Sequence, residues 1–176
     1  MPLPGAAEVI AFWREAGPPK WFAKDEGFDV EIVRRFEAAH HAAARGELAD
    51  WEATAEGSLA LLILLDQFPR NIWRGSAHAF ATDPLARAIA ARALAAGHDA
   101  QTDPALRGFF YLPFEHSERL EDQDRCLALC EALDAESVKQ LRQTSGLGAT
   151  KPVLTLSPVL HQRRANRNVT EYRPER

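Results

Sequence analysis

The stretch that decides the fold is Leu59-Ala60-Leu61-Leu62-Ile63-Leu64-Leu65-Asp66-Gln67-Phe68-Pro69-Arg70-Asn71-Ile72-Trp73-Arg74. An unbroken apolar run at 59–65 leads directly into a cluster of polar side chains. The run is far shorter than the roughly 20 residues of a membrane-spanning helix, so we interpret it as a buried helix. Pro69 lacks a backbone donor and predicts a kink or an end of this helix. Backbone carbonyls are then left free, and Gln67 or Asn71 could satisfy them.

Helical periodicity extends over most of the remaining chain, and glycine and proline separate its segments. No segment shows the two-residue alternation that is typical of strands joined by hairpins. Thr82-Asp83-Pro84 has the pattern of a helix start, with a capping side chain before a proline in the first turn. The sequence therefore predicts an all-α protein with helices over 6–16, 26–45, 57–66, 83–96, 104–112 and 120–133.

The composition suits one domain followed by a basic tail. The chain has 176 residues and a net charge of −4. From Lys139 to the end, eight Lys and Arg residues stand against two Glu residues, which gives this segment +6 and leaves −10 on residues 1–138. We predict an all-helical domain over 1–143 and a divergent tail over 144–176 that is loop or only partly ordered. The acidic body argues against nucleic acid as a partner.

The sequence also predicts the compartment. The N-terminus has no basic region followed by an apolar core, as a secretory signal would. Cys126 and Cys130 are four residues apart on one helix face, which favours reduced core positions over a redox pair. We therefore expect a cytoplasmic protein without a membrane partner. The sequence does not indicate an oligomeric state.

Several motifs together resemble one protein family. They are Trp21-Phe22, Phe28-Asp29, the segment 64–71, the segment 80–86 (Phe-Ala-Thr-Asp-Pro-Leu-Ala) and the segment 112–118 (Leu-Pro-Phe-Glu-His-Ser-Glu). These residues resemble the bacterial family defined by domain of unknown function 924, over about residues 5 to 135. The resemblance implies antiparallel helix pairs in a tetratricopeptide-like array, and it implies no activity. That family usually continues to a Phe-Gly-Arg-Phe-Pro-His-Arg-Asn motif, of which only the fragment 164–168 is present here.

The polar residues after the apolar run form a first candidate site. Asp66 and Arg70 are four residues apart and would be neighbours on a continuing helix. A charge so close to the core must be paired, so one interpretation is a buried ion pair that fixes a helix junction. In the other interpretation, Arg70 and Arg74 hold an anion in a cleft. Gln67 and Asn71 complete this candidate ligand-binding set.

The segment Glu115-His116-Ser117-Glu118 forms a second polar cluster. A carboxylate beside an imidazole can transfer protons or bind ligand, which makes Glu115, His116 and Asp66 the candidate catalytic residues. Capping of the following helix by Ser117 is the structural alternative. If His116 pairs with Asp66 or Arg70, the two polar clusters become one site.

The sequence predicts neither a metal nor a cofactor. Glu37 and His40 form a Glu-x-x-His pattern, but di-iron helical bundles need two copies of it. There is no H-E-x-x-H zinc motif, and the Gly-rich segment 146–151 lacks the ending of a phosphate-binding loop. We expect His40 and His41 on a solvated helix face.

Three functions are compatible with the sequence, and the sequence does not decide whether the protein is an enzyme. The first is a helical module that binds a peptide or a small anionic ligand in a polar cleft, as the concave surfaces of helical repeats do. The second is a hydrolase-type enzyme that uses Glu115 and His116 with Asp66. The third is a structural module for protein interactions.

Overall fold

The computed structural model describes residues 2–145 and contains only helices and their connections over that range, which confirms the all-α class. The tetratricopeptide-like pairing of the helices stays a prediction. The elements are α1 Ala6–Trp21, α2 Glu26–Ala44, η1 Ala49–Ala53, α3 Ala55–Leu62, η2 Ile63–Gln67, α4 Phe68–Ile72, η3 Ala77–Phe80, α5 Asp83–Ala95, α6 Pro104–Arg107, η4 Gly108–Phe110, α7 Leu112–Glu115 and α8 Leu120–Ser145.

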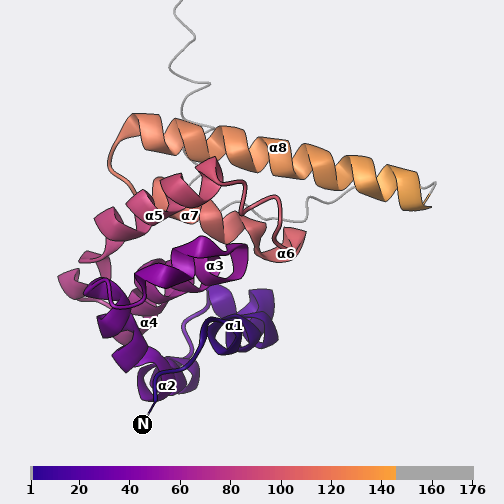
Figure 1. Ribbon diagram of the computed structural model, residues 1–176. Coiled ribbons are helices and arrows are strands. Elements are labelled where there is room, and N and C mark those ends of the chain that lie inside the picture. Colours follow the sequence, from indigo (N-terminus) through magenta and orange to yellow (C-terminus); the bar gives the residue numbers. More distant parts are fainter. Residues whose placement is uncertain (1, 146–176) are drawn as a thin grey trace, which may run out of the picture. The chain divides into compact units, whose positions relative to one another are not determined.

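By its internal contacts the chain divides into two compact units, residues 1–117 and 118–176. The first unit holds α1 to α7, which Figure 1 shows in indigo to pink. The second begins just before α8, which extends to Ser145 and so beyond the predicted end at residue 133. The predicted tail from residue 146 onward lies outside the described residues.

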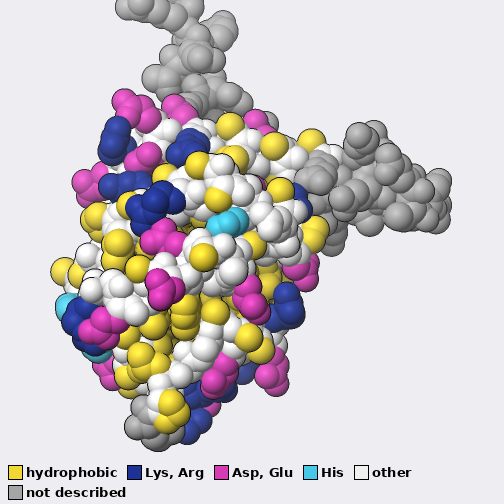
Figure 2. Space-filling model, viewed as in Figure 1, with side chains coloured by type: hydrophobic (Ala, Val, Ile, Leu, Met, Phe, Trp, Pro, Cys, Tyr) yellow, Lys and Arg dark blue, Asp and Glu magenta, His cyan; other side chains and the backbone are white. Residues whose placement is uncertain are grey.

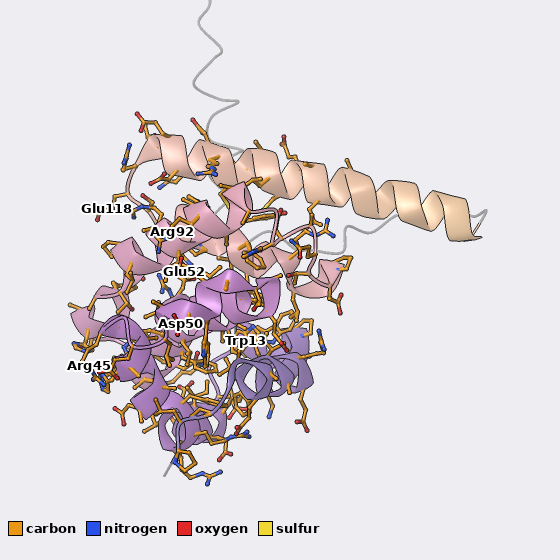
Figure 3. All side chains as sticks on the ribbon, in the orientation of Figure 1. Trp13, Arg45, Asp50, Glu52, Arg92 and Glu118 are labelled. Atoms are coloured by element: carbon orange, nitrogen blue, oxygen red, sulfur yellow. The ribbon has the colours of Figure 1, made fainter. Side chains whose placement is uncertain are left out.

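The core of the first unit is built around α3 and η2. Every residue from Gly57 to Pro69 is buried, because α3 contacts α1 on one side and α5 on another. Trp13 of α1, labelled in Figure 3, is fully buried and meets Phe68 and Phe109 edge to face. The uninterrupted apolar run therefore has the role that its composition predicts, a helix that is buried all round.

The first helix shows how local signals and tertiary packing combine. We predicted an end at residue 16, and Gly17 indeed leaves the helical conformation with φ 67° and ψ 175°. A second helical piece follows through Pro18 and Pro19 to Trp21. Trp21 donates its indole N–H to the Trp13 carbonyl at 2.7 Å and meets Phe109, so this extra turn is held by aromatic contacts.

The start of α3 is fixed by a close approach of two segments. A Cβ atom on Gly57 would lie 2.0 Å from the Trp51 carbonyl oxygen of η1, so only glycine fits there. Thr54 caps the helix by accepting from the Gly57 N–H at 3.0 Å. In the same region, Glu52 and Arg92 form a two-pronged pair at 2.7 and 2.8 Å that joins η1 to α5 (Figure 3).

Two predicted boundaries are wrong. The central helix does not end near Pro69, because η2 and α4 continue it to Ile72. The predicted helix over 104–112 is three short pieces, α6, η4 and α7, and Pro113 lies in the first turn of α7 instead of interrupting a helix.

The exposed charges do not segregate on the face seen in Figure 2, where acidic and basic side chains intermingle. Within residues 2–145, no helix combines the length and the apolarity that crossing a bilayer requires.

Candidate functional site

The site is organised by a π-helical turn, η2, placed between α3 and α4. The Phe68 N–H donates to the Ile63 carbonyl five residues earlier, so the Leu64 carbonyl loses its usual partner. Pro69 has no N–H, so the Leu65 carbonyl loses its partner as well. Side chains from elsewhere replace both donors, since His40 Nδ1 lies 2.8 Å from the Leu64 oxygen and Thr82 Oγ1 lies 2.6 Å from the Leu65 oxygen.

These contacts correct two sequence predictions. The freed carbonyls are satisfied by His40 and Thr82, and not by Gln67 or Asn71. His40 therefore does not lie on a solvated face, since only 3% of it is exposed, whereas His41 is exposed as predicted. Burial lowers the pKa of His40 despite its bond to the carbonyl, so the ring is held neutral with its proton on Nδ1. Thr82 does not cap α5, because its hydroxyl is used here.

Asp66 lies within this turn and is completely buried. Its Oδ2 accepts from Gln67 Nε2 at 2.5 Å, and its Oδ1 lies 2.8 Å from His116 Nδ1 and 3.1 Å from Arg70 Nη1. Burial alone would raise the pKa of the carboxyl, but His116, Arg70 and Gln67 outweigh it and lower the pKa. Asp66 is thus a fully ionised carboxylate inside the protein.

His116 follows α7 directly and joins the second polar cluster to the first. Since Asp66 is ionised, its carboxylate accepts a hydrogen bond from the N–H of Nδ1. In the neutral ring, Nε2 then carries a lone pair. Burial would lower the pKa of His116, but Asp66 outweighs it and the pKa is raised. The side chain is 24% exposed, and Nε2 has no hydrogen-bond partner among the side chains and backbone groups that the structure describes.

Arg70 closes the site on its other side. Its guanidinium binds Asp83 of α5 with two parallel bonds of 3.0 and 2.9 Å, and Nη1 also donates to the Asp66 backbone carbonyl. Phe80, which is 57% exposed, places its ring centroid 5.4 Å from the guanidinium carbon. Both prongs of Arg70 are therefore occupied by a carboxylate of the chain itself.

Asn71 and Arg74 belong to a separate cluster around Asp29 of α2. Arg74 binds both Asp29 oxygens at 2.9 Å, and Asn71 Nδ2 donates to one of them at 2.7 Å. Burial would raise the pKa of Asp29, but Arg74 and Asn71 lower it. This second guanidinium is likewise held by a carboxylate of the chain, and the cluster ties α2 to α4.

The structure thus divides the predicted site residues into two groups. Asp66, Gln67, Arg70 and His116 come together, while Asn71 and Arg74 do not join them. Glu115 lies next to His116 in sequence and is half-buried. Asp29, Asp83, Thr82 and His40 were missed as members of these clusters. Asp83 and Thr82 stood in a motif that predicted a helix start and carried part of the family resemblance, and neither interpretation gave them these partners. Nothing in the sequence singled out His40 as a partner of a carbonyl.

The arrangement offers proton transfer more readily than metal binding. Within residues 2–145, no group of three or more His, Cys, Asp or Glu side chains is placed to hold a metal ion. A buried carboxylate on Nδ1 fixes the orientation and the tautomer of an imidazole and leaves Nε2 for a ligand or a water.

Comparison with known proteins agrees with the motifs. A family model described as bacterial protein of unknown function, DUF924, matches residues 9–171. The chain belongs to this family. The match extends beyond residue 135, where the resemblance of the motifs ended, and spans the fragment at 164–168. No curated protein matches the chain significantly. A solved structure of a protein of unknown function from Agrobacterium tumefaciens is 43% identical, with a TM-score of 0.72 over 92% of this chain and 97% of that one.

Proposed function

We propose that the protein is an enzyme of the acid–base type, in which His116 removes a proton from a water that attacks an ester-like substrate. The imidazolium then returns this proton to the leaving alcohol oxygen as the ester C–O bond breaks. The observation that carries this proposal is the pair of Asp66 Oδ1 and His116 Nδ1 at 2.8 Å, with Nε2 left without a partner among the protein groups whose positions are described. The buried carboxylate holds the ring in one orientation. It also stabilises the imidazolium that forms when Nε2 takes the proton.

The carboxylate of Asp66 supports this role. It raises the pKa of His116 from its ordinary value of 6.5, because the nearby negative charge stabilises the imidazolium that a general base becomes when it takes a proton. The Asp66 carboxylate accepts hydrogen bonds from Gln67 and His116, forms an ion pair with Arg70 and stays ionised. Gln67 and Arg70 thus act as positioning residues, which keep the carboxylate aimed at the ring.

The proposal can be tested with 4-nitrophenyl acetate, an activated ester that a well-placed imidazole hydrolyses. We expect His116→Gln to lower the rate at least about tenfold, a loss of about 1.4 kcal/mol of transition-state stabilisation. The matched control is His41→Gln, because His41 is an exposed histidine without a carboxylate partner among the described residues. It should change the rate by less than about twofold.

A second variant separates chemistry from folding. In His116→Ala the removed ring leaves a space beside Asp66, and added free imidazole should restore part of the lost rate. Equal rates for the wild type and His116→Gln would overturn the proposal. The proposal would also be overturned if His116→Ala kept the circular dichroism spectrum of the wild type and added imidazole did not restore its rate.

Binding without catalysis is the second candidate, and the direction of the same pKa shift favours it. Below its raised pKa, His116 is an imidazolium whose Nε2–H donates to an anionic group. In this alternative a small anion or a carboxylate of a peptide contacts His116, while Arg70 and Arg74 stay on Asp83 and Asp29. Calorimetry with acetate and inorganic phosphate should then give affinity that His116→Gln removes and that falls as the pH rises.

A further inference from the structure

A cavity of about 450 Å³ lies between α1 and the first half of α2, outside the site described above. Its volume is within the range of small-molecule sites in proteins. Phe12 and Phe28 line it, and their rings stack with centroids 5.3 Å apart and planes 7° apart. None of the residues that line this cavity belongs to the Asp66 or the Asp29 cluster, so the cavity is separate from both.

The chain's own cations show what the aromatic rings attract. The Lys20 ammonium lies 5.5 Å from the centroid of Phe28, and the Arg35 guanidinium carbon lies 4.8 Å from that of Phe12. The negative face of an aromatic ring favours a positive charge in this position. Lys20 is therefore an alkylammonium group that already occupies the edge of the cavity.

The charged side chains that line the cavity also favour the binding of a cation. Three carboxylates line the cavity, Glu15, Asp25 and Glu31, against the two basic side chains. The charge of Arg35 is compensated by carboxylate oxygens of Glu8 at 3.2 Å and Glu31 at 3.8 Å. Residues 1–138 as a whole carry −10, which attracts cations to this part of the chain.

Glu15 and Lys20 are the two groups that a ligand can engage most simply. Asp25 is used as the N-cap of α2, where it accepts from the Phe28 N–H at 3.0 Å. Glu15 is exposed at the cavity and makes no ion pair or hydrogen bond with the side chains and backbone groups that the structure describes. Among those same groups, the contact of Lys20 is with the ring of Phe28.

The geometry points to a binding site for an alkylammonium group, which replaces Lys20 over Phe28 and pairs with Glu15. The same chemistry is supplied by a free aliphatic diamine and by a lysine side chain of a peptide. This site is independent of the proposed function of His116.

Two ligands and two controls test the inference by nitrogen–proton correlation spectra, with the amide of Gly27, which lines the cavity, as the reporter. We expect saturable shifts with 1,5-diaminopentane and with N-acetyl-lysine methylamide. Hexanoate and 1-pentanol, which lack the ammonium, should give none. Tighter binding of the diamine would assign the site to free diamines, and equal or tighter binding of the lysine amide would assign it to a peptide. Shifts with hexanoate, or no saturable shift with either amine, would overturn the inference.

Paired variants make the test specific to the cavity. Glu15→Gln should weaken the binding of the amine about two- to fivefold, the size expected for a partly exposed pair. Lys20→Gln should tighten it by a similar factor, because the resident cation no longer competes.

Glu26→Gln and Lys24→Gln make the same changes of charge on residues that do not line the cavity. They should alter the affinity by less than about twofold. Equal effects of the cavity variants and of their controls would show only general attraction to an acidic surface, and would overturn the inference.

Discussion

Two arginines lie in or just after α4. Each binds an aspartate of another helix through two of its nitrogens. Arg70 binds Asp83 of α5, and Arg74 binds Asp29 of α2. The two pairs have nearly the same geometry, but their surroundings differ. The first adjoins a second carboxylate that is completely buried, and the second is partly open to solvent, with Arg74 37% exposed.

This difference indicates that the Asp29 cluster joins helices, whereas the Asp66 cluster is a candidate functional site. The Asp29 cluster closes on itself, because its aspartate is matched by Arg74 and Asn71. The cluster of Asp66 contains His116, which has one nitrogen on the carboxylate and the other without a partner in the described part of the protein. Arginine–aspartate pairing therefore holds α2, α4 and α5 together, and the imidazole is what makes one of the two clusters a candidate for chemistry.

The largest effect on stability is expected from Asp66→Ala. The change leaves Arg70, His116 and Gln67 without their buried acceptor, and breaking a buried pair in this way costs about 3–5 kcal/mol. We expect about 3 kcal/mol, because Arg70 keeps Asp83. Urea denaturation followed by circular dichroism measures the loss.

Asp29→Ala is the matched change in the other cluster. Arg74, its charged partner, is 37% exposed and can bind water instead, so we expect a loss of about 1 kcal/mol. Equal losses for the two variants, or a loss below about 1 kcal/mol for Asp66→Ala, would show that the greater burial of the Asp66 carboxylate does not make its cluster the more important one for stability.

A smaller effect is expected from Thr82→Val, which keeps the shape of the side chain and removes its hydroxyl. The Leu65 carbonyl in the π turn then loses the donor that replaces the missing N–H of Pro69. One such hydrogen bond contributes about 1 kcal/mol. Thr82→Ser retains the hydroxyl and serves as the control. If both variants unfold at the same urea concentration, the hydroxyl does not support the turn.

The subtlest expected effect is a dependence of stability on pH. The pKa of His116 is raised in the folded state, so its pairing with Asp66 stabilises the protein fully below pH 6.5 and loses that effect as the pH rises through the folded pKa. His116→Gln should therefore cost more stability at pH 6 than at pH 9, in denaturation series at both values. Asp29→Ala should cost the same at both, since none of its partners titrates in that window. A cost of His116→Gln that increases with pH would contradict the raised pKa.

The burial of the central helix and the meeting of the two polar clusters were predictable from sequence, because both follow from what must be buried. A charge placed directly after seven apolar residues needs a partner, and His116 of the second cluster is that partner. The spacing of Asp66 and Arg70 also predicted their ion pair, because residues four apart stay neighbours as the helix continues past Pro69.

The rest depended on contacts between distant segments. Proline predicted a break, but tertiary donors from His40 and Thr82 satisfy the carbonyls that Pro69 and the π turn leave free, so the helix continues. One of the two interpretations of Arg70 predicted an anionic ligand, but the carboxylate that its two nitrogens bind is Asp83, for which the sequence predicted only a place at a helix start. Local patterns identify groups that need partners, and only the packed structure determines which residues supply them.

The central claim is that the carboxylate of Asp66 aligns His116 and leaves Nε2 available. Nitrogen NMR of labelled histidine side chains, followed through a pH titration, tests it most directly. We predict that neutral His116 carries its proton on Nδ1 and that it titrates above the ordinary value of 6.5. A neutral ring with the proton on Nε2, or a midpoint below 6.5, would contradict the pairing of His116 with Asp66.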